Sequence, residues 1–144
     1  MTTTLPGMRR IALSAIALGL ALAATACETG GGAADPGFCT DVRQMKTAVS
    51  QFRSAVEGGQ VDAVRLQSTQ LVTTLNDLVP RAPSNVDGAL GEYRDAYTRI
   101  EGLLAAKSYD PTKLSSKERD SVLKPKLGGD AEDDVEEFLR ESCK

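Results

Sequence analysis

Apolar side chains recur at alternating spacings of four and three residues in two segments, and this pattern constrains the fold more than any other feature. In the first segment they fall at Phe38, Val42, Met45, Val49, Phe52 and Val56. In the second they fall at Val86, Leu90, Tyr93, Tyr97, Ile100 and Leu104. Such spacing lines one face of an α-helix with apolar residues, and that face is buried by packing on other helices. No segment carries a competing strand pattern, so we expect an all-α fold.

Two further segments complete the predicted helices. The segment over residues 61–78 carries its apolar face on Val61, Val64, Leu71, Leu75 and Leu78, with Ser68 at one expected apolar position. The segment over residues 130–144 carries Val135, Phe138, Leu139 and Cys143. Four amphipathic helices joined by short connections favour an up-down-up-down four-helix bundle.

Helix ends are marked by residues suited to capping. The starts are marked by Asp35 with Pro36, Ser84 with Asp87, Ser115 with Glu118, and Asp130. The second and third pairs resemble capping boxes. The first helix is expected to stop at Gly58-Gly59, and the second before Pro80. Residues 107–126 hold six basic and three acidic residues, and we expect an exposed excursion there with one short helix that ends near Lys124.

The N-terminal segment has the organisation of a secretory signal peptide. Arg9 and Arg10 precede sixteen uncharged residues, 11–26, which is short for a membrane-spanning helix of about 20 residues. We predict a signal peptide over residues 1–26, a flexible Gly-rich tether over 27–37 and a helical domain over 38–144. A Gly-rich tether of this length spans roughly 17 Å, which would keep the domain close to the membrane.

The end of this segment resembles the lipobox of bacterial lipoproteins. It reads Leu22-Ala23-Ala24-Thr25-Ala26-Cys27, and the resemblance implies cleavage before Cys27 and attachment of a diacylglyceryl group to its thiol. The family prefers Leu at the position of Ala24. Residues 24–26 also fit the ordinary A-x-A cleavage pattern, which would leave Cys27 as a free thiol at the mature N-terminus.

The number of cysteines bears on whether Cys27 is lipidated or left as a free thiol. The chain contains Cys27, Cys39 and Cys143, and an odd number in an exported protein raises the question of the unpaired thiol. If Cys27 is lipidated, Cys39 and Cys143 remain as a pair. An up-down-up-down bundle places the start of its first helix and the end of its fourth at the same end, so we predict a Cys39–Cys143 disulfide.

Composition excludes several classes of site. The chain contains no histidine, which removes Ser-His-Asp and Cys-His catalytic arrangements and any His-containing zinc site. Residues 27–144 hold fifteen Lys and Arg against twenty Asp and Glu, a net charge of −5. This balance argues against nucleic acid as a partner. We predict no catalytic residues, no metal and no cofactor.

The domain resembles small actinobacterial lipoproteins and secreted proteins of unknown function. The resemblance is carried by Phe38-Cys39, by Ala82-Pro83-Ser84-Asn85-Val86 in mid-chain, and by Cys143. It covers residues 38–143 and implies the helical fold and the disulfide, and it implies no activity.

Three features invite a functional interpretation. The acidic run over residues 130–137 could bind calcium, but it lacks the spacing of an EF-hand loop and fits a solvated helix N-terminus. Glu92, Asp95 and Glu101 could suggest a pair of catalytic carboxylates, but acids are ordinary on the polar face of an amphipathic helix. Tyr93 and Tyr97 lie one turn apart on the apolar stripe, where core packing is the favoured explanation and a ligand groove is the alternative.

The leading hypothesis is a non-enzymatic helical module, lipid-anchored on the outer face of the cytoplasmic membrane, which binds a protein of the cell envelope. A carrier that holds a small apolar ligand between its helices is the alternative. A hydrolase or redox enzyme is disfavoured by the missing histidine and by the absence of a C-x-x-C pair. An apolar cavity between the first and third helices would favour the carrier.

Overall fold

The computed structural model describes residues 34–144, which belong to one compact unit over 31–144. The predicted signal peptide and Cys27 lie outside the described residues. The described residues form α-helices and two short 3-10 helices without any strand, so the all-α prediction is confirmed. The α-helices are α1 Pro36–Glu57, α2 Val61–Leu78, α3 Asp87–Ala106, α4 Ser116–Leu123 and α5 Ala131–Glu141. Among them, none is both long and apolar enough to cross a membrane.

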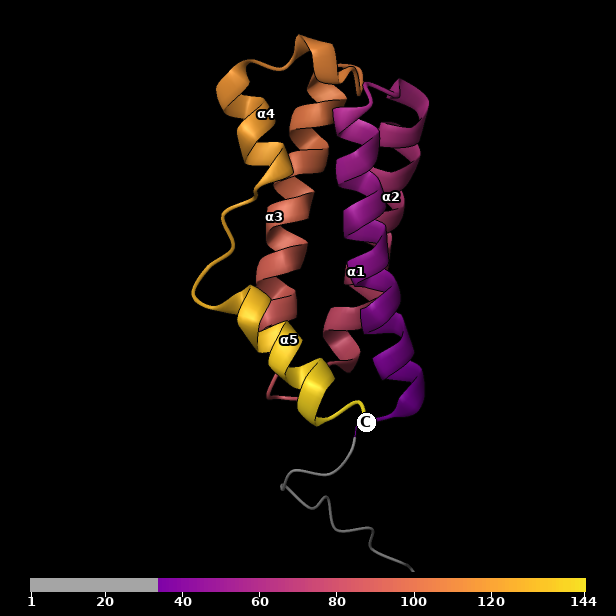
Figure 1. Cartoon of the computed structure of the whole chain (residues 1–144), viewed down its shortest axis with the longest axis vertical. Helices are drawn as coiled ribbons and strands as arrows, with labels where there is room; N and C mark the ends of the chain where they lie inside the picture. Colours follow the sequence, from indigo (N-terminus) through magenta and orange to yellow (C-terminus); the bar gives the residue numbers. More distant parts are fainter. Residues whose placement is uncertain (1–33) are drawn as a thin grey trace, which may run out of the picture. The chain divides into compact units, whose positions relative to one another are not determined.

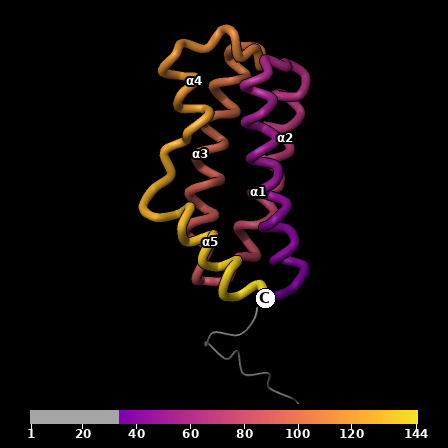
Figure 2. The backbone as a smooth tube through the Cα atoms, in the orientation of Figure 1, coloured from indigo at the N-terminus to yellow at the C-terminus, as the bar shows by residue number. Residues whose placement is uncertain are grey.

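The three long helices run side by side with alternating direction, and the two short helices cover their open side (Figure 1). α2 packs against both α1 and α3. α4 lies near the end of α1, where the Arg119 guanidinium donates to the carbonyl oxygens of Val56 and Glu57 at 3.4 and 3.3 Å. α5 lies along the first half of α1, and its Glu136 pairs with Lys46 near the middle of that helix. The trace in Figure 2 shows α4 and α5 following one another along α3, with α4 near its upper part and α5 near its lower part.

α1 begins and ends where the sequence predicts. The Asp35 carboxylate accepts a hydrogen bond from the Phe38 backbone N–H at 2.9 Å, and proline occupies the first turn. Gly58 caps the C-terminus, and Gly59 follows at φ 68°, a left-handed conformation that glycine adopts without strain. All six residues of the predicted apolar stripe on α1 are buried in the core.

One prediction for α2 is confirmed, whereas one prediction for α3 is wrong. Ser68 is buried at an apolar position of α2, and its hydroxyl donates to the Arg65 carbonyl oxygen at 3.1 Å, so this buried hydroxyl is not left unpaired. The predicted capping box of Ser84 and Asp87 is wrong. The capping residue of α3 is Val86, which is buried and makes no side-chain capping bond. Ser84 precedes that position by two residues, too early to reach the free N–H groups of the first turn.

The basic stretch over residues 107–126 is only partly exposed. The capping box of α4 is confirmed, because Ser115 and Glu118 exchange hydrogen bonds between side chain and backbone at 3.3 and 2.7 Å. Leu114 and Val122 are buried in the common core, which differs from the exposed excursion that we predicted. The few apolar residues of this stretch therefore attach it to the long helices, while its basic side chains remain outside.

The Cys39–Cys143 disulfide is confirmed, with the two Cα atoms 5.6 Å apart. Cys143 follows α5 instead of lying within it, since the helix ends at Glu141. Further contacts join the same two ends. The Ala34 backbone N–H donates to the Ser142 carbonyl oxygen at 2.9 Å, and the rings of Phe38 and Phe138 meet edge to face at 5.7 Å.

Removing the disulfide is predicted to destabilise the domain without abolishing its helices. The bond has a sequence separation of 104, and for a loop of about 100 residues chain entropy alone gives about 4.7 kcal/mol. We expect Cys39→Ser/Cys143→Ser to lower the free energy of unfolding by about 2–5 kcal/mol and to loosen α5 first. Urea unfolding followed by circular dichroism measures the loss. Equal stability of the variant and the oxidised parent would contradict this role of the bond.

Candidate functional site

Tyr93 and Tyr97 lie inside the domain instead of lining an open groove. They are 4 % and 2 % exposed, and their rings stack with centroids 6.3 Å apart. The Tyr97 ring also meets the Phe52 ring of α1 edge to face at 5.9 Å. These aromatic contacts fill the space between α1 and α3, where a carrier would need a cavity.

The hydroxyl ends of these tyrosines lie in a polar environment. The Tyr97 hydroxyl oxygen and Arg53 Nε are buried, and neither has a hydrogen-bond partner among the described residues. Burial, and then the negative charge of Glu132, raise the pKa of Tyr93 to about 12, while Arg53 opposes the rise. Burial likewise raises the pKa of Tyr97. Both phenols therefore stay protonated at neutral pH.

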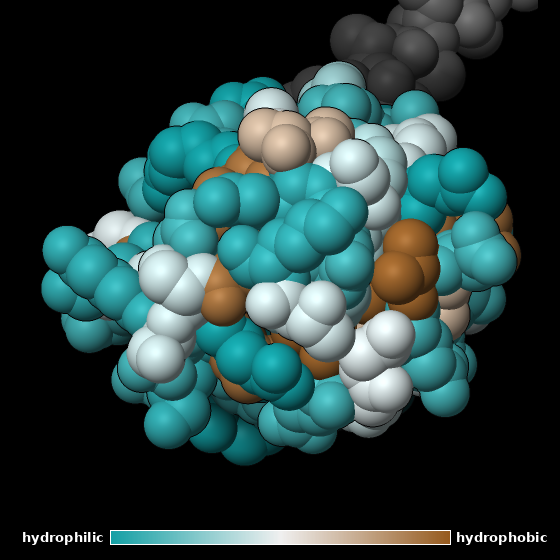
Figure 3. Space-filling model, turned by 90° about the horizontal axis from the view of Figure 1, so that it is seen from above, coloured by the Kyte–Doolittle hydropathy of each residue, from teal (hydrophilic) through white to brown (hydrophobic). Residues whose placement is uncertain are grey.

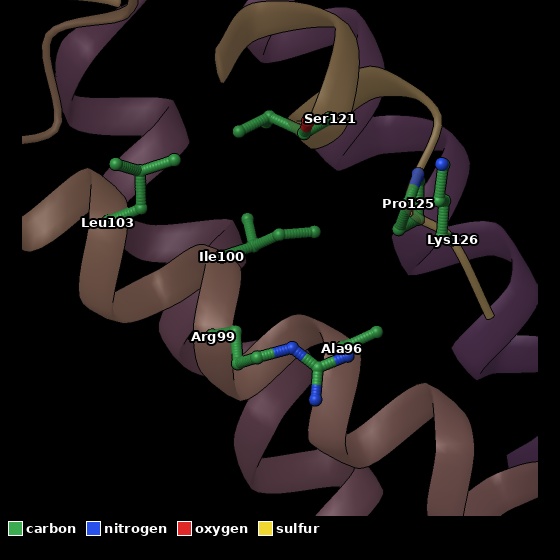
Figure 4. A pocket seen from close by; sticks show the side chains of 8 residues that line it. Ala96, Arg99, Ile100, Leu103, Ser121, Pro125 and Lys126 are labelled. Carbon is green, nitrogen blue, oxygen red and sulfur yellow. The ribbon is translucent and has the colours of Figure 1, made fainter. Parts of the chain in front are cut away.

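A surface cleft opens between α3 and the segment from α4 to residue 126 (Figure 4). Its volume is about 250 Å³. One wall comes from α3, and the other comes from α4 and the two residues Pro125 and Lys126. The apolar side chains that line it are Ala96, Ile100, Leu103, Val122 and Pro125. The cleft therefore offers a short apolar surface next to solvent.

Two cations stand at the rim of this cleft. Arg99 and Lys126 come from opposite walls, and both are exposed. Within residues 34–144 neither side chain takes part in an ion pair with a carboxylate. Both charges are thus available to a ligand, and an anionic group above the apolar surface would lie between them.

Seven of the eight residues that line the cleft lie in the basic half of the domain. If each long helix is divided at its middle, the half distant from residue 34 comprises residues 47–69 and 97–126, with nine basic and six acidic residues. The half that contains residue 34 comprises residues 34–46, 70–96 and 127–144, with six basic and thirteen acidic residues. Figure 3 shows the distant end from above, with mostly hydrophilic residues and separate hydrophobic ones. The fold thus separates a net charge of +3 from one of −7.

The carboxylates that could suggest catalysis or metal binding do not converge. Glu92 accepts from the Gly128 backbone N–H at 3.1 Å, Asp95 pairs with Arg94 at 2.8 Å, and Glu101 accepts from the Tyr109 hydroxyl at 2.6 Å. Within residues 34–144, no group of three or more His, Cys, Asp or Glu residues is placed to hold a metal ion. The acidic run instead occupies the exposed first turns of α5, where the helix dipole favours negative charge.

The cleft was not predicted from the sequence, although the sequence contains a weak signal of it. Ala96 and Leu103 flank the predicted apolar stripe of α3 and widen it toward one side. Val122 is the one fully buried side chain of α4. When an apolar stripe is wider than the face that one partner helix covers, a second helix must pack against it. The periodicity does not identify that second helix as α4.

Comparison with known proteins identifies no relative. No family model, no curated protein and no solved structure matches the chain. The function proposed below therefore rests on the motifs of the chain itself, the cleft and the distribution of charge.

Chelation of metal ions is predicted to leave the stability unchanged. The acidic side chains of α5 point to separate partners or to solvent, so we expect no bound divalent ion to stabilise the fold. Thermal unfolding in excess chelator, with and without added calcium, tests this prediction. A lower melting temperature in chelator that calcium restores would show that residues 130–137 bind the ion.

The buried tyrosines are predicted to make the fold sensitive to alkali. Because the pKa of Tyr93 is about 12 in the folded chain and about 10 in an unfolded one, the unfolded state loses its proton first. Stability is therefore fully present below about pH 10 and falls as the pH rises toward about 12. Chemical unfolding at a series of pH values should show this fall, and Tyr93→Phe should reduce it. An identical alkaline loss in Tyr93→Phe would contradict the assignment.

Proposed function

We propose that the protein is a non-enzymatic interaction module, lipid-anchored through Cys27 on the outer face of the cytoplasmic membrane, that binds another protein of the cell envelope. The observation that carries the proposal is the position of the cleft relative to the start of the domain. Residue 34 lies at the end closed by the disulfide, and seven of the eight residues that line the cleft lie in the other half. α1 alone spans about 33 Å at 1.5 Å per residue. An anchored domain would thus present its cleft away from the lipid.

The finer description of the fold belongs to the same proposal. We regard the domain as an up-down-up-down four-helix bundle in which α4 and α5 together occupy the fourth position. Their succession along the open side of α1 and α3 supports this view. Kinship with the small actinobacterial lipoproteins that the Phe38-Cys39 and Cys143 motifs resemble is consistent with such a fold.

The carrier alternative receives less support from the packing. A carrier requires an apolar cavity within the bundle, and the interior between α1 and α3 is occupied by Phe52, Tyr93 and Tyr97. The cleft beside α3 is smaller than the roughly 300–1,000 Å³ typical of small-molecule pockets. It suits one or two side chains of a partner better than a whole apolar ligand.

Lipid attachment is predicted to depend on Cys27 alone. Metabolic labelling with palmitate should mark the parent chain and not Cys27→Ser, because the other two cysteines are bonded to each other. Cys27→Ser should also leave the membrane fraction or accumulate as an uncleaved precursor. Equal labelling of both chains would refute the anchor.

Partner binding at the cleft is predicted to be detectable by photocrosslinking in native membranes. A photoreactive benzoylphenylalanine at Ser121, which lines the cleft, should yield a covalent adduct with one protein. The matched position is Thr73, which is exposed on α2. Adducts at neither position, or equal adducts at both, would contradict a partner site at the cleft.

A further inference from the structure

We infer that the cleft between α3 and α4 binds an acidic amphipathic helix of the partner protein, one apolar side chain of which enters the cleft while neighbouring carboxylates meet Arg99 and Lys126. This inference rests on the proposed interaction function and specifies the chemistry of the partner.

The dimensions of the cleft favour a side chain as its occupant. A volume of about 250 Å³ accommodates the end of a Leu or Phe residue, and the apolar surface of Ile100, Leu103 and Val122 would cover it. Only a small apolar area is available, so burial in the cleft supplies an anchor instead of the whole affinity. The remaining contacts must come from the polar rim.

The charges at the rim select an acidic partner. Arg99 and Lys126 stand on opposite walls without a carboxylate partner among residues 34–144. Lys124 is exposed nearby and also lacks such a partner. A helix with acids on both sides of an apolar stripe would place one carboxylate toward each wall. Such complementarity raises the association rate and rejects basic partners.

An anionic membrane fits the same surface poorly. α4 and α5 cover the same side of α1 and α3 (Figure 1). Turning the cleft toward a bilayer would therefore bring the α5 acids Glu132, Asp133 and Asp134 toward it as well. At physiological ionic strength charges interact over about 8 Å, so anionic lipid would repel this side. A separate protein helix can contact α4 without reaching α5.

The test uses the full chain in nanodiscs of neutral phosphatidylcholine and a synthetic fluorescent helix with Glu on both sides of a Leu stripe. Binding is measured by fluorescence anisotropy. Arg99→Gln/Lys126→Gln should weaken binding by about tenfold or more, whereas the matched pair Arg140→Gln/Lys144→Gln, with the same change in net charge, should alter it less than about twofold. Ser121→Trp, which fills the cleft and leaves the charge unchanged, should weaken binding as well. Thermal unfolding confirms that each variant is folded.

Two control peptides separate the contributions of charge and apolar contact. Replacing every Glu by Gln, or every Leu by Ser, should abolish measurable binding, and rising salt should weaken the binding of the parent peptide. If both double variants weakened binding equally, only the net charge of the domain would matter for peptide binding. That result would overturn the inference. So would unimpaired binding to the Ser121→Trp variant.

Other occupants give different results. Recruitment of the parent chain, but not of Arg99→Gln/Lys126→Gln, to phosphatidylglycerol vesicles would assign the cleft to lipid. Self-association in sedimentation that the same variant abolishes would assign it to a second copy. Either result overturns the inference. Failure of the peptide to bind would leave palmitate labelling of Cys27 unaffected, so the anchor and the partner chemistry fail separately.

Discussion

The bond between Cys39 and Cys143 is the constraint on which the arrangement of the domain depends. α5 buries only Ala131, Val135 and Phe138, and residues 130–144 carry seven acids against two basic residues. Three buried side chains supply little more than about 5 kcal/mol before conformational entropy is subtracted. Because the disulfide joins the first turn of α1 to the segment that follows α5, α5 remains on α1 and α3 in spite of its weak apolar face. The same closure brings residue 34 and the C-terminus to one end of the domain.

That closure also explains how the chain acquires two electrically different halves. Residues 97–126 hold seven basic and four acidic residues, and folding places them away from the acidic α5. Attachment of the tether at the acidic end would direct the basic half away from an anionic membrane. The apolar cleft with the cationic side chains Arg99 and Lys126 lies mostly in that half. The proposed anchor at Cys27 and the polarity of the domain thus favour the same surface for the proposed partner.

The sequence predicted the helices closely, because helix formation leaves local signals. The stripe from Phe38 to Val56, the cap at Asp35 and the capping box at Ser115 were all readable from spacing and residue type. Ser84 failed as a cap because burial of Val86 sets the start of α3, and burial depends on residues far away in the chain. The burial of Leu114 and Val122 in the core also depends on distant residues. The sequence did not reveal it, so the basic stretch was expected to be exposed.

The sequence by itself determined which residues form helices, which faces of those helices are apolar and which two cysteines are bonded. It also supplied every motif that bears on Cys27. Only the tertiary structure decided that Tyr93 and Tyr97 fill the interior and that Arg99 and Lys126 line the same cleft. Periodicity is a local property that reports that a face is buried, whereas the identity of the opposing residue depends on how helices distant in sequence pack together.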